Sequence, residues 1–211
     1  MSIITGLSGL SNTVHGTSGD DNVQISRASG LAGALGFYDV NINGQHQLMT
    51  KEQLQNTTFD LGAGDDRLTV AANVDVDITA RGGAGDDVMI GGTGDDNFDG
   101  GSGDDFLSGR DGRDYLKGGS GKDTLLGGNH RDVLVGGSGD DYLDGGKGID
   151  KNNGGSGDNT VKFDFADYLG AVSPLPAAKA PSAMFATNAN PLALQDAADH
   201  PSRFVDWAAK R

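Results

Sequence analysis

Residues 82–162 read GGAGDDVMI, GGTGDDNFD, GGSGDDFLS, GRDGRDYLK, GGSGKDTLL, GGNHRDVLV, GGSGDDYLD, GGKGIDKNN and GGSGDNTVK, which are nine nonapeptides in unbroken register. The units follow the pattern Gly-Gly-x-Gly-x-Asp-x-apolar-x, with exceptions at Arg110, His130, Asn152 and Asn159. A turn in which glycine can adopt a positive φ therefore alternates with a three-residue strand. Position 8 supplies the inward side chains, which are Met89, Phe98, Leu107, Leu116, Leu125, Leu134, Leu143, Asn152 and Val161. This fixed period predicts a β-solenoid, because a unit can bury its apolar side chain only against its neighbours.

The nine units resemble the haemolysin-type calcium-binding repeats of the repeats-in-toxin (RTX) family, since position 1 is always Gly and position 6 is Asp in eight units. The resemblance implies an all-β chain with a right-handed parallel β-roll that holds calcium in its turns. Two units would then form one 18-residue coil, so that alternate units stack on each other. The first stack comprises Asp87, Asp105, Asp123, Asp141 and Asn159, and the second stack comprises Asp96, Asp114, Asp132 and Asp150.

Carboxylates that stack at the strand spacing of roughly 4.8 Å repel one another unless a cation lies between them. Calcium suits these gaps, because it accepts six or more oxygen ligands in flexible geometry, whereas magnesium requires a strict octahedron. Zinc and iron favour His and Cys, which the units almost lack. Counting neighbours in each stack predicts about six strong calcium sites and one weak site that includes Asn159.

By the resemblance, each ion would bind two position-6 side chains together with backbone carbonyls, from positions 2 and 4 of one unit and from positions 1 and 3 of the other. The glycine carbonyls expected to take part are those of Gly83, Gly85, Gly92, Gly94, Gly101, Gly103, Gly119, Gly121, Gly137 and Gly139. His130 replaces the position-4 Gly of its unit. We expect it to offer only its backbone carbonyl, at a conformational cost, because calcium prefers oxygen.

Two earlier segments, GTSGDDNVQI at 16–25 and LGAGDDRLTV at 61–70, echo the repeat and place Asp21 and Asp66 at its position 6. Asp66 precedes Asp87 by 21 residues, so residues 61–81 are expected to form a wider coil, with Asp66 as a further, weaker calcium ligand. Asp21 lacks a stacking partner in register and is not expected to be one.

The chain divides into four parts: an N-terminal segment (1–15), an irregular β cap (16–81), the nonapeptide β-roll (82–162), and a capping strand, Pro/Ala linker and tail (163–211). Alternating polarity predicts strands at YDVNIN (38–43), TTFDL (57–61) and VDVDIT (74–79), and KEQLQ around Leu54 predicts a short helix. The tail is short and partly helical or disordered; it is either a helix that docks on the roll or an uncleaved export signal.

Composition limits the partners. The net charge of −14 arises from 29 Asp and one Glu, which disfavours nucleic acids and anionic membranes. There is no Cys, no apolar run of 18 residues, and no Sec-type signal at the N-terminus. We therefore expect a secreted, monomeric protein that is exported by another route, a type I-like C-terminal signal being one.

The same residues argue against an enzyme, because no HExxH or Gly-x-Ser-x-Gly motif occurs and the four His are scattered. The sequence therefore predicts a secreted bacterial calcium-binding protein whose roll folds when calcium binds outside the cell. The alternative is a secreted effector or adhesion protein that uses the roll as a scaffold and acts through its N-terminal region or its tail. Its partner would be a protein or glycan of a host or a cell surface.

Overall fold

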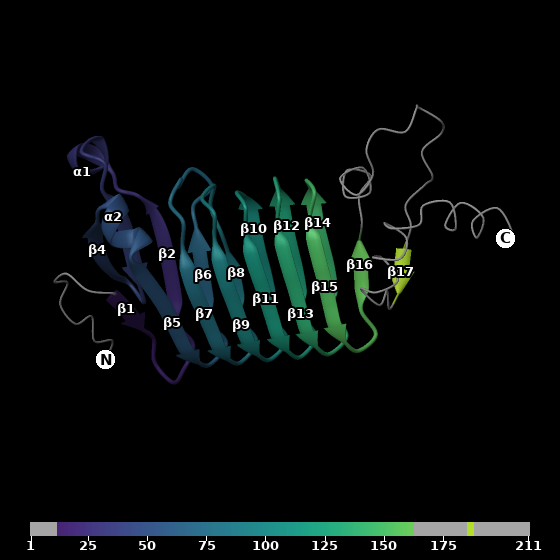
Figure 1. Ribbon diagram of the computed structural model, residues 1–211. Helices are drawn as coiled ribbons and strands as arrows, with labels where there is room; N and C mark the ends of the chain where they lie inside the picture. The colour runs from purple at the N-terminus through teal and green to yellow at the C-terminus, as the bar shows by residue number, and fades with distance from the viewer. Residues whose placement is uncertain (1–11, 163–184, 188–211) are drawn as a thin grey trace, which may run out of the picture.

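The computed structural model describes residues 12–162 and 185–187, which form a parallel β-solenoid of about six turns (Figure 1). The strands are β1 (Asn12–His15), β2 (Asn22–Arg27), β3 (Tyr38–Ile42), β4 (Gln45–Met49), β5 (Thr57–Ala63), β6 (Arg67–Val70), β7 (Thr79–Ala84), β8 (Val88–Ile90), β9 (Asn97–Ser102), β10 (Phe106–Asp111), β11 (Tyr115–Ser120), β12 (Thr124–Asn129), β13 (Val133–Ser138), β14 (Tyr142–Lys147), β15 (Lys151–Ser156), β16 (Thr160–Lys162) and β17 (Phe185–Thr187). Two short helices, α1 (Gly30–Ala34) and α2 (Lys51–Gln55), lie in the N-terminal part. No described helix is both long and apolar enough to cross a membrane.

The strands form two sheets. One has the order β1-β5-β7-β9-β11-β13-β15, and the other has the order β17-β16-β14-β12-β10-β8-β6-β2-β3-β4. Within the roll every neighbouring pair is parallel and offset by 18 residues, as Leu116 and Leu134 illustrate. This offset confirms the coil of two nonapeptides. The coil before it is wider, because Leu68 pairs with Met89 at an offset of 21 residues.

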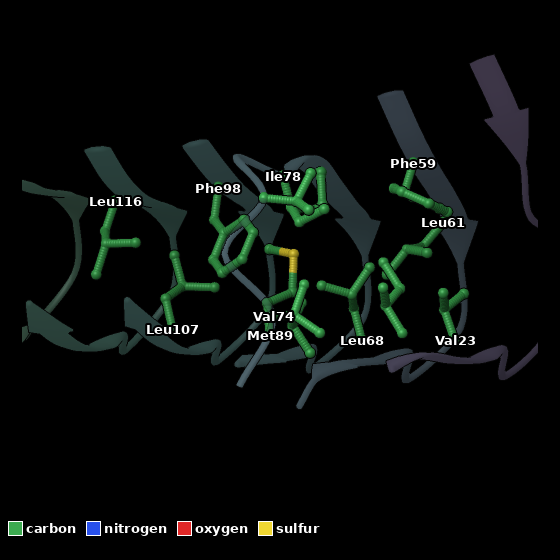
Figure 2. Close-up of a cluster of buried hydrophobic side chains, with 14 of the residues drawn as sticks. Val23, Phe59, Leu61, Leu68, Val74, Ile78, Met89, Phe98, Leu107 and Leu116 are labelled. Carbon is green, nitrogen blue, oxygen red and sulfur yellow. The ribbon is translucent and has the colours of Figure 1, made fainter. Parts of the chain in front are cut away.

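The core lies between the two sheets, where the position-8 side chains from both sheets meet (Figure 2). All of the predicted file is buried except Asn152, whose side chain is half-buried. The core is uneven along the chain. Of the 23 buried hydrophobic residues among those described, 15 lie in residues 23–80 and only eight in residues 82–162. The N-terminal part therefore has a much denser apolar core than the roll.

In the N-terminal cap, the sheet that is parallel within the roll continues with antiparallel strands. β2 pairs in parallel with β6 and antiparallel with β3, which in turn pairs with β4. The predicted helix near Leu54 is confirmed as α2, and it begins with a capping box in which Thr50 and Gln53 satisfy each other's backbone N–H groups. At the other end, β17 pairs antiparallel with β16. The predicted helix or signal in the tail lies outside the described residues.

Two predictions about strands are wrong. Most strands of the roll have six residues rather than three, because the parallel ladder continues through positions 1 to 3 of the next unit, as the pairs Gly119–Gly137 and Ser120–Ser138 show. Residues 74–78 of VDVDIT form no strand. Their side chains do alternate between buried and exposed, but they form the turn of the wide coil.

Candidate metal centre

The position-6 side chains form two buried ladders in the turns of the roll. In the first stack, the N–H of Asp87 donates to Oδ1 of Asp105 at 2.8 Å, and the N–H of Asp105 donates to Oδ1 of Asp123 at 2.9 Å. The second stack repeats the pattern, with the N–H of Asp96 and Oδ1 of Asp114 2.7 Å apart. The full set is Asp87, Asp96, Asp105, Asp114, Asp123, Asp132 and Asp141, which are 0–2% exposed, followed by Asn159 at 4% and Asp150, which is half-buried. The structure thus brings together each predicted stack.

The second carboxylate oxygen is buried without a hydrogen-bond partner along most of these ladders. Among the described residues, Oδ2 lacks a partner in Asp66, Asp87, Asp105, Asp114, Asp123, Asp132 and Asp141. A buried charged oxygen in this state is costly unless it binds a cation. Because the same oxygen atom lacks a partner at the same position of successive units, this property belongs to the repeat and not to any single turn.

Backbone carbonyls surround these oxygens. A Cβ built on Gly82 would contact Oδ2 of Asp87 and would lie 2.6 Å from the carbonyl oxygen of Gly100, so both oxygens border one small space. A Cβ on Gly101 would collide with the carbonyl oxygen of Gly83, and one on Gly103 with that of Gly85. The carbonyl oxygens of positions 2 and 4 therefore face the next coil.

The carbonyls of positions 1 and 3 face the preceding coil. The oxygen of Gly100 borders the space beside Gly82, and the oxygen of Ser102 accepts the N–H of Gly85 at 2.9 Å. Each gap between stacked units in this stack is consequently lined by oxygens from both sides. These oxygens come from the positions that the predicted ligand pattern names, and an all-oxygen lining suits calcium.

Burial raises the pKa of the seven position-6 carboxyl groups from Asp87 to Asp141 above the ordinary value of 3.8. The pKa of Asp105 rises to about 7, first because the carboxyl is withdrawn from water and then because Asp123 and Asp87 lie near it, although the N–H of Asp87 opposes the rise. Desolvation is again the largest cause for Asp114, whose pKa rises to about 8. The pKa also rises to about 7 for Asp96 and to about 6 for Asp87, Asp123 and Asp132. Without a cation, the carboxyl groups of Asp96, Asp105 and Asp114 resist ionisation near neutral pH.

We expect the metal-stripped protein to show more β-structure at about pH 4 than at about pH 7.5. The unfolded carboxyl groups titrate near 3.8 and the folded ones at about 6 to 8, so the fold is favoured at low pH and loses stability as pH rises through that window. Far-UV circular dichroism of protein dialysed free of metal measures the change. Calcium-loaded protein is the control and should show no loss between these two pH values. A metal-free fold that strengthens as pH rises would contradict this assignment of the pKa shifts.

Arg110 and His130, which replace Gly at positions 2 and 4, both adopt the left-handed conformation of the glycines around them, with φ of 78° and 83°. The predicted conformational cost at His130 is therefore present. Its imidazole is exposed, and its N–H donates to the carbonyl of Lys147 at 2.7 Å. Two of the predicted ligands differ from the others, because Gly92 and Gly94 do not adopt a positive φ.

Asp66 extends the first stack beyond the nine units. Its N–H donates to Oδ1 of Asp87 at 2.8 Å, its own Oδ2 has no partner, and the N–H of Gly64 donates to the carbonyl of Ala84 at 2.8 Å. Gly62 and Gly64 take positive φ values of 111° and 121°. The gap between Asp66 and Asp87 therefore has the same lining as the gaps inside the array.

The prediction that Asp21 lacks a stacking partner is wrong. Asp21 lies in register with Asp66, and its N–H donates to Oδ1 of Asp66 at 2.7 Å. The intervening hairpin of β3 and β4 separates the two by 45 residues, which hid the register in the sequence. The carboxylate of Asp21 nevertheless differs from the others, because it accepts hydrogen bonds from the Thr17 N–H and from Nδ2 of Asn43.

Among the described residues, no three or more His, Cys, Asp or Glu side chains gather into a metal site. This finding fits the oxygen arrangement above, in which each gap has two position-6 side chains and the backbone completes the lining. A site of this kind cannot be recognised from its side chains alone.

Comparison with known families agrees with the geometry. The family model described as RTX calcium-binding nonapeptide repeat (4 copies) matches residues 81–116, 99–129, 117–151 and 126–161. Searches of curated proteins and of solved structures gave no significant match. The matched region coincides with the two aspartate ladders. Residues 81–161 of this chain are thus RTX calcium-binding nonapeptide repeats.

Proposed function

We propose that this chain is a secreted calcium-binding protein whose roll folds when calcium binds outside the cell. The observation that carries the proposal is the row of buried, unpartnered carboxylate oxygens that repeats along the first stack. Calcium would supply the positive charge that these oxygens need. RTX repeats also suggest a secreted bacterial protein.

The residues that would hold the ions follow from the lining of each gap. In the first stack, Asp66, Asp87, Asp105, Asp123 and Asp141 bound four successive gaps, and Asn159 closes a fifth with a neutral amide. The amide oxygen of Asn159 accepts the N–H of Asp141 at 2.8 Å, so the ladder continues while one charge is lost. We therefore propose a weaker site there. The gap between Asp66 and Asp87 joins the strong group, although it lies partly outside the nine units.

The same residues connect binding with folding. With one inward apolar side chain for nine residues, a unit has little to offset a backbone ordering cost of about 1–2 kcal/mol per residue. Stacking also brings carboxylates together and buries them, which opposes folding until a cation neutralises them. At extracellular calcium, where module dissociation constants of roughly 0.1–1 mM are useful, binding and folding would be one event.

Fractionation of the producing cells tests the location. We expect the protein in the medium, because a chain that stays unfolded inside the cell and folds outside is easily passed through an export channel. Recovery of folded protein from the cytoplasm alone would contradict the secreted location and leave calcium binding untouched.

We propose no catalytic role. His15 and His46 each lie beside a single carboxylate, Asp60 at 3.4 Å and Asp39 at 2.9 Å, and both imidazoles are largely exposed. Such pairs are ordinary surface contacts. They give no reason to propose an enzyme.

Equilibrium dialysis with metal analysis tests calcium binding. We expect several calcium ions per chain at millimolar free calcium, and no displacement by an equal concentration of magnesium, because calcium accepts six or more oxygen ligands in flexible geometry whereas magnesium requires a near-ideal octahedron. A chain that binds no calcium, or that binds magnesium equally well, would contradict the proposal.

One observation favours a second candidate, an effector or adhesion protein that uses the roll as a scaffold. Leu31 and Leu35, one helical turn apart at α1, are 77% and 67% exposed, which is unusual for large apolar side chains. If this function is correct, the double change Leu31→Ser and Leu35→Ser should abolish attachment to cells and leave calcium binding intact. Ile149→Ser, at an exposed position of the roll, is the control. Unchanged attachment of the double variant would exclude a role for α1.

A further inference from the structure

The second stack begins on an apolar turn. Residues 74–78 of the wide coil lie beneath the unit Gly91–Asp99, and Val74, Val76 and Ile78 are at most 1% exposed. Figure 2 shows Val74 and Ile78 within the buried cluster. The N–H of Ile78 donates to Oδ1 of Asp96 at 2.8 Å, which is the bond that a position-6 Asp makes elsewhere. Ile78 therefore occupies position 6 of this turn and brings no carboxylate.

Arg110 reaches back to this turn from the unit Gly109–Lys117. Its Nη1 donates to the carbonyl oxygen of Gly91 at 3.0 Å and to that of Val70 at 2.9 Å, 19 and 40 residues earlier in the chain. Gly91 holds position 1, whose carbonyl faces the preceding coil and is a calcium ligand in the pattern of these repeats. The guanidinium therefore lies between the apolar turn and the unit that contains Asp96, where its fixed charge binds carbonyl oxygens that would otherwise turn toward a metal ion.

The gap between Asp96 and Asp114 differs from the gaps of the first stack. Oδ2 of Asp96 accepts the N–H of Gly92 at 3.1 Å, whereas the corresponding oxygens of Asp87, Asp105 and Asp123 have no partner. Gly92 and Gly94 do not adopt the left-handed conformation that their counterparts in the first stack adopt. The side chain of Arg110 also has to pass this gap to reach Gly91 and Val70.

We propose that Arg110 excludes calcium from the start of the second stack: its side chain crosses the gap between Asp96 and Asp114, so that this gap takes no ion; this inference rests on calcium binding by the other gaps. On the side of the second stack, the apolar turn and the guanidinium together close the first coils without metal. The second stack would then hold one ion fewer than its four position-6 Asp residues indicate. The dense apolar core of residues 23–80 would therefore be joined to the roll without calcium on the side of the second stack, whereas the gap between Asp66 and Asp87 joins the same coils through calcium on the side of the first.

Calcium counting on full-length variants tests the inference. Arg110→Gly restores the Gly of the repeat, and we expect it to bind about one more calcium ion per chain than the natural protein. His130→Gly is the matched control, because it also removes a left-handed non-glycine residue from the second stack but no hydrogen bond to a carbonyl of an earlier coil; its ion count should not change. An unchanged count for Arg110→Gly, or an equal gain in both variants, would overturn the inference.

A second pair of variants keeps the test decisive if Arg110→Gly folds poorly. Asp96→Asn should leave the number of bound calcium ions unchanged, whereas Asp87→Asn, at the same position of the first stack, should lower the number of ions or their affinity. Equal losses in the two variants would mean that the Asp96 gap binds calcium. If the natural protein itself binds none, the proposed function fails instead, so the two failures are distinguishable.

Discussion

Removal of calcium is expected to abolish protection from hydrogen exchange in residues 82–162 while residues 22–80 keep much of theirs. The roll has eight of the 23 buried hydrophobic residues of the described chain, whereas residues 23–80 have 15. Its ladders also hold buried carboxylates with no partner for Oδ2. The cap has a denser core, and of its two position-6 carboxylates only Asp66 lacks a partner for Oδ2, because the carboxylate of Asp21 is bonded to Thr17 and Asn43.

Hydrogen exchange with mass spectrometry, in chelator and in millimolar calcium, resolves the two regions. Magnesium at equal concentration is the control and should leave the roll unprotected. Equal protection of both regions in chelator would show that the roll needs no metal. Loss of protection in both regions would show that the cap depends on the roll.

The second large effect is expected at Asp123, which borders two gaps of the first stack. Its Oδ1 accepts the N–H of Asp105 at 2.9 Å, and its Oδ2 has no protein partner. Asp123→Asn keeps the shape, and Asn159 shows that an amide can hold this ladder bond. The variant thus removes charge alone, and we expect the calcium midpoint of folding to rise by roughly tenfold, which corresponds to about 1.4 kcal/mol.

Asp21→Asn is the matched control, because Asp21 also stacks at position 6 but has protein partners for its carboxylate. Its calcium midpoint should shift much less than that of Asp123→Asn. Titration of both variants by far-UV circular dichroism gives the comparison. Equal shifts would contradict the assignment of Asp123 to two calcium sites.

The period of nine was sufficient to predict the solenoid, the apolar file and both stacks. Each position in the repeat has one structural role. The location of Leu107 in the core and that of Asp105 in the first stack therefore follow from their positions in the repeat alone. The register of Asp21 was missed because a hairpin of two strands separates it from Asp66. Residues 74–78 have the alternation of a strand, but their burial comes from a turn whose inner face is apolar.

Other features depend on contacts that no local pattern reports. The sequence shows Arg110 only as a replacement of the position-2 Gly, because its partners Gly91 and Val70 are reached only after the wide coil sets the stacking. The partner of Asp96 was equally hidden, since it depends on the backbone conformation of Gly92. The sequence predicts the repeating site well and its exceptions poorly, because the exceptions arise where the repeat meets a different coil.

The central claim, that calcium folds the roll, is tested most directly by far-UV circular dichroism of the full chain in chelator, titrated with calcium from micromolar to millimolar concentration. Our account predicts a cooperative change from coil to β-structure, added to the constant signal of the cap, that magnesium does not reproduce. A chain whose β-structure is complete before calcium is added, or that responds equally to magnesium, would contradict it.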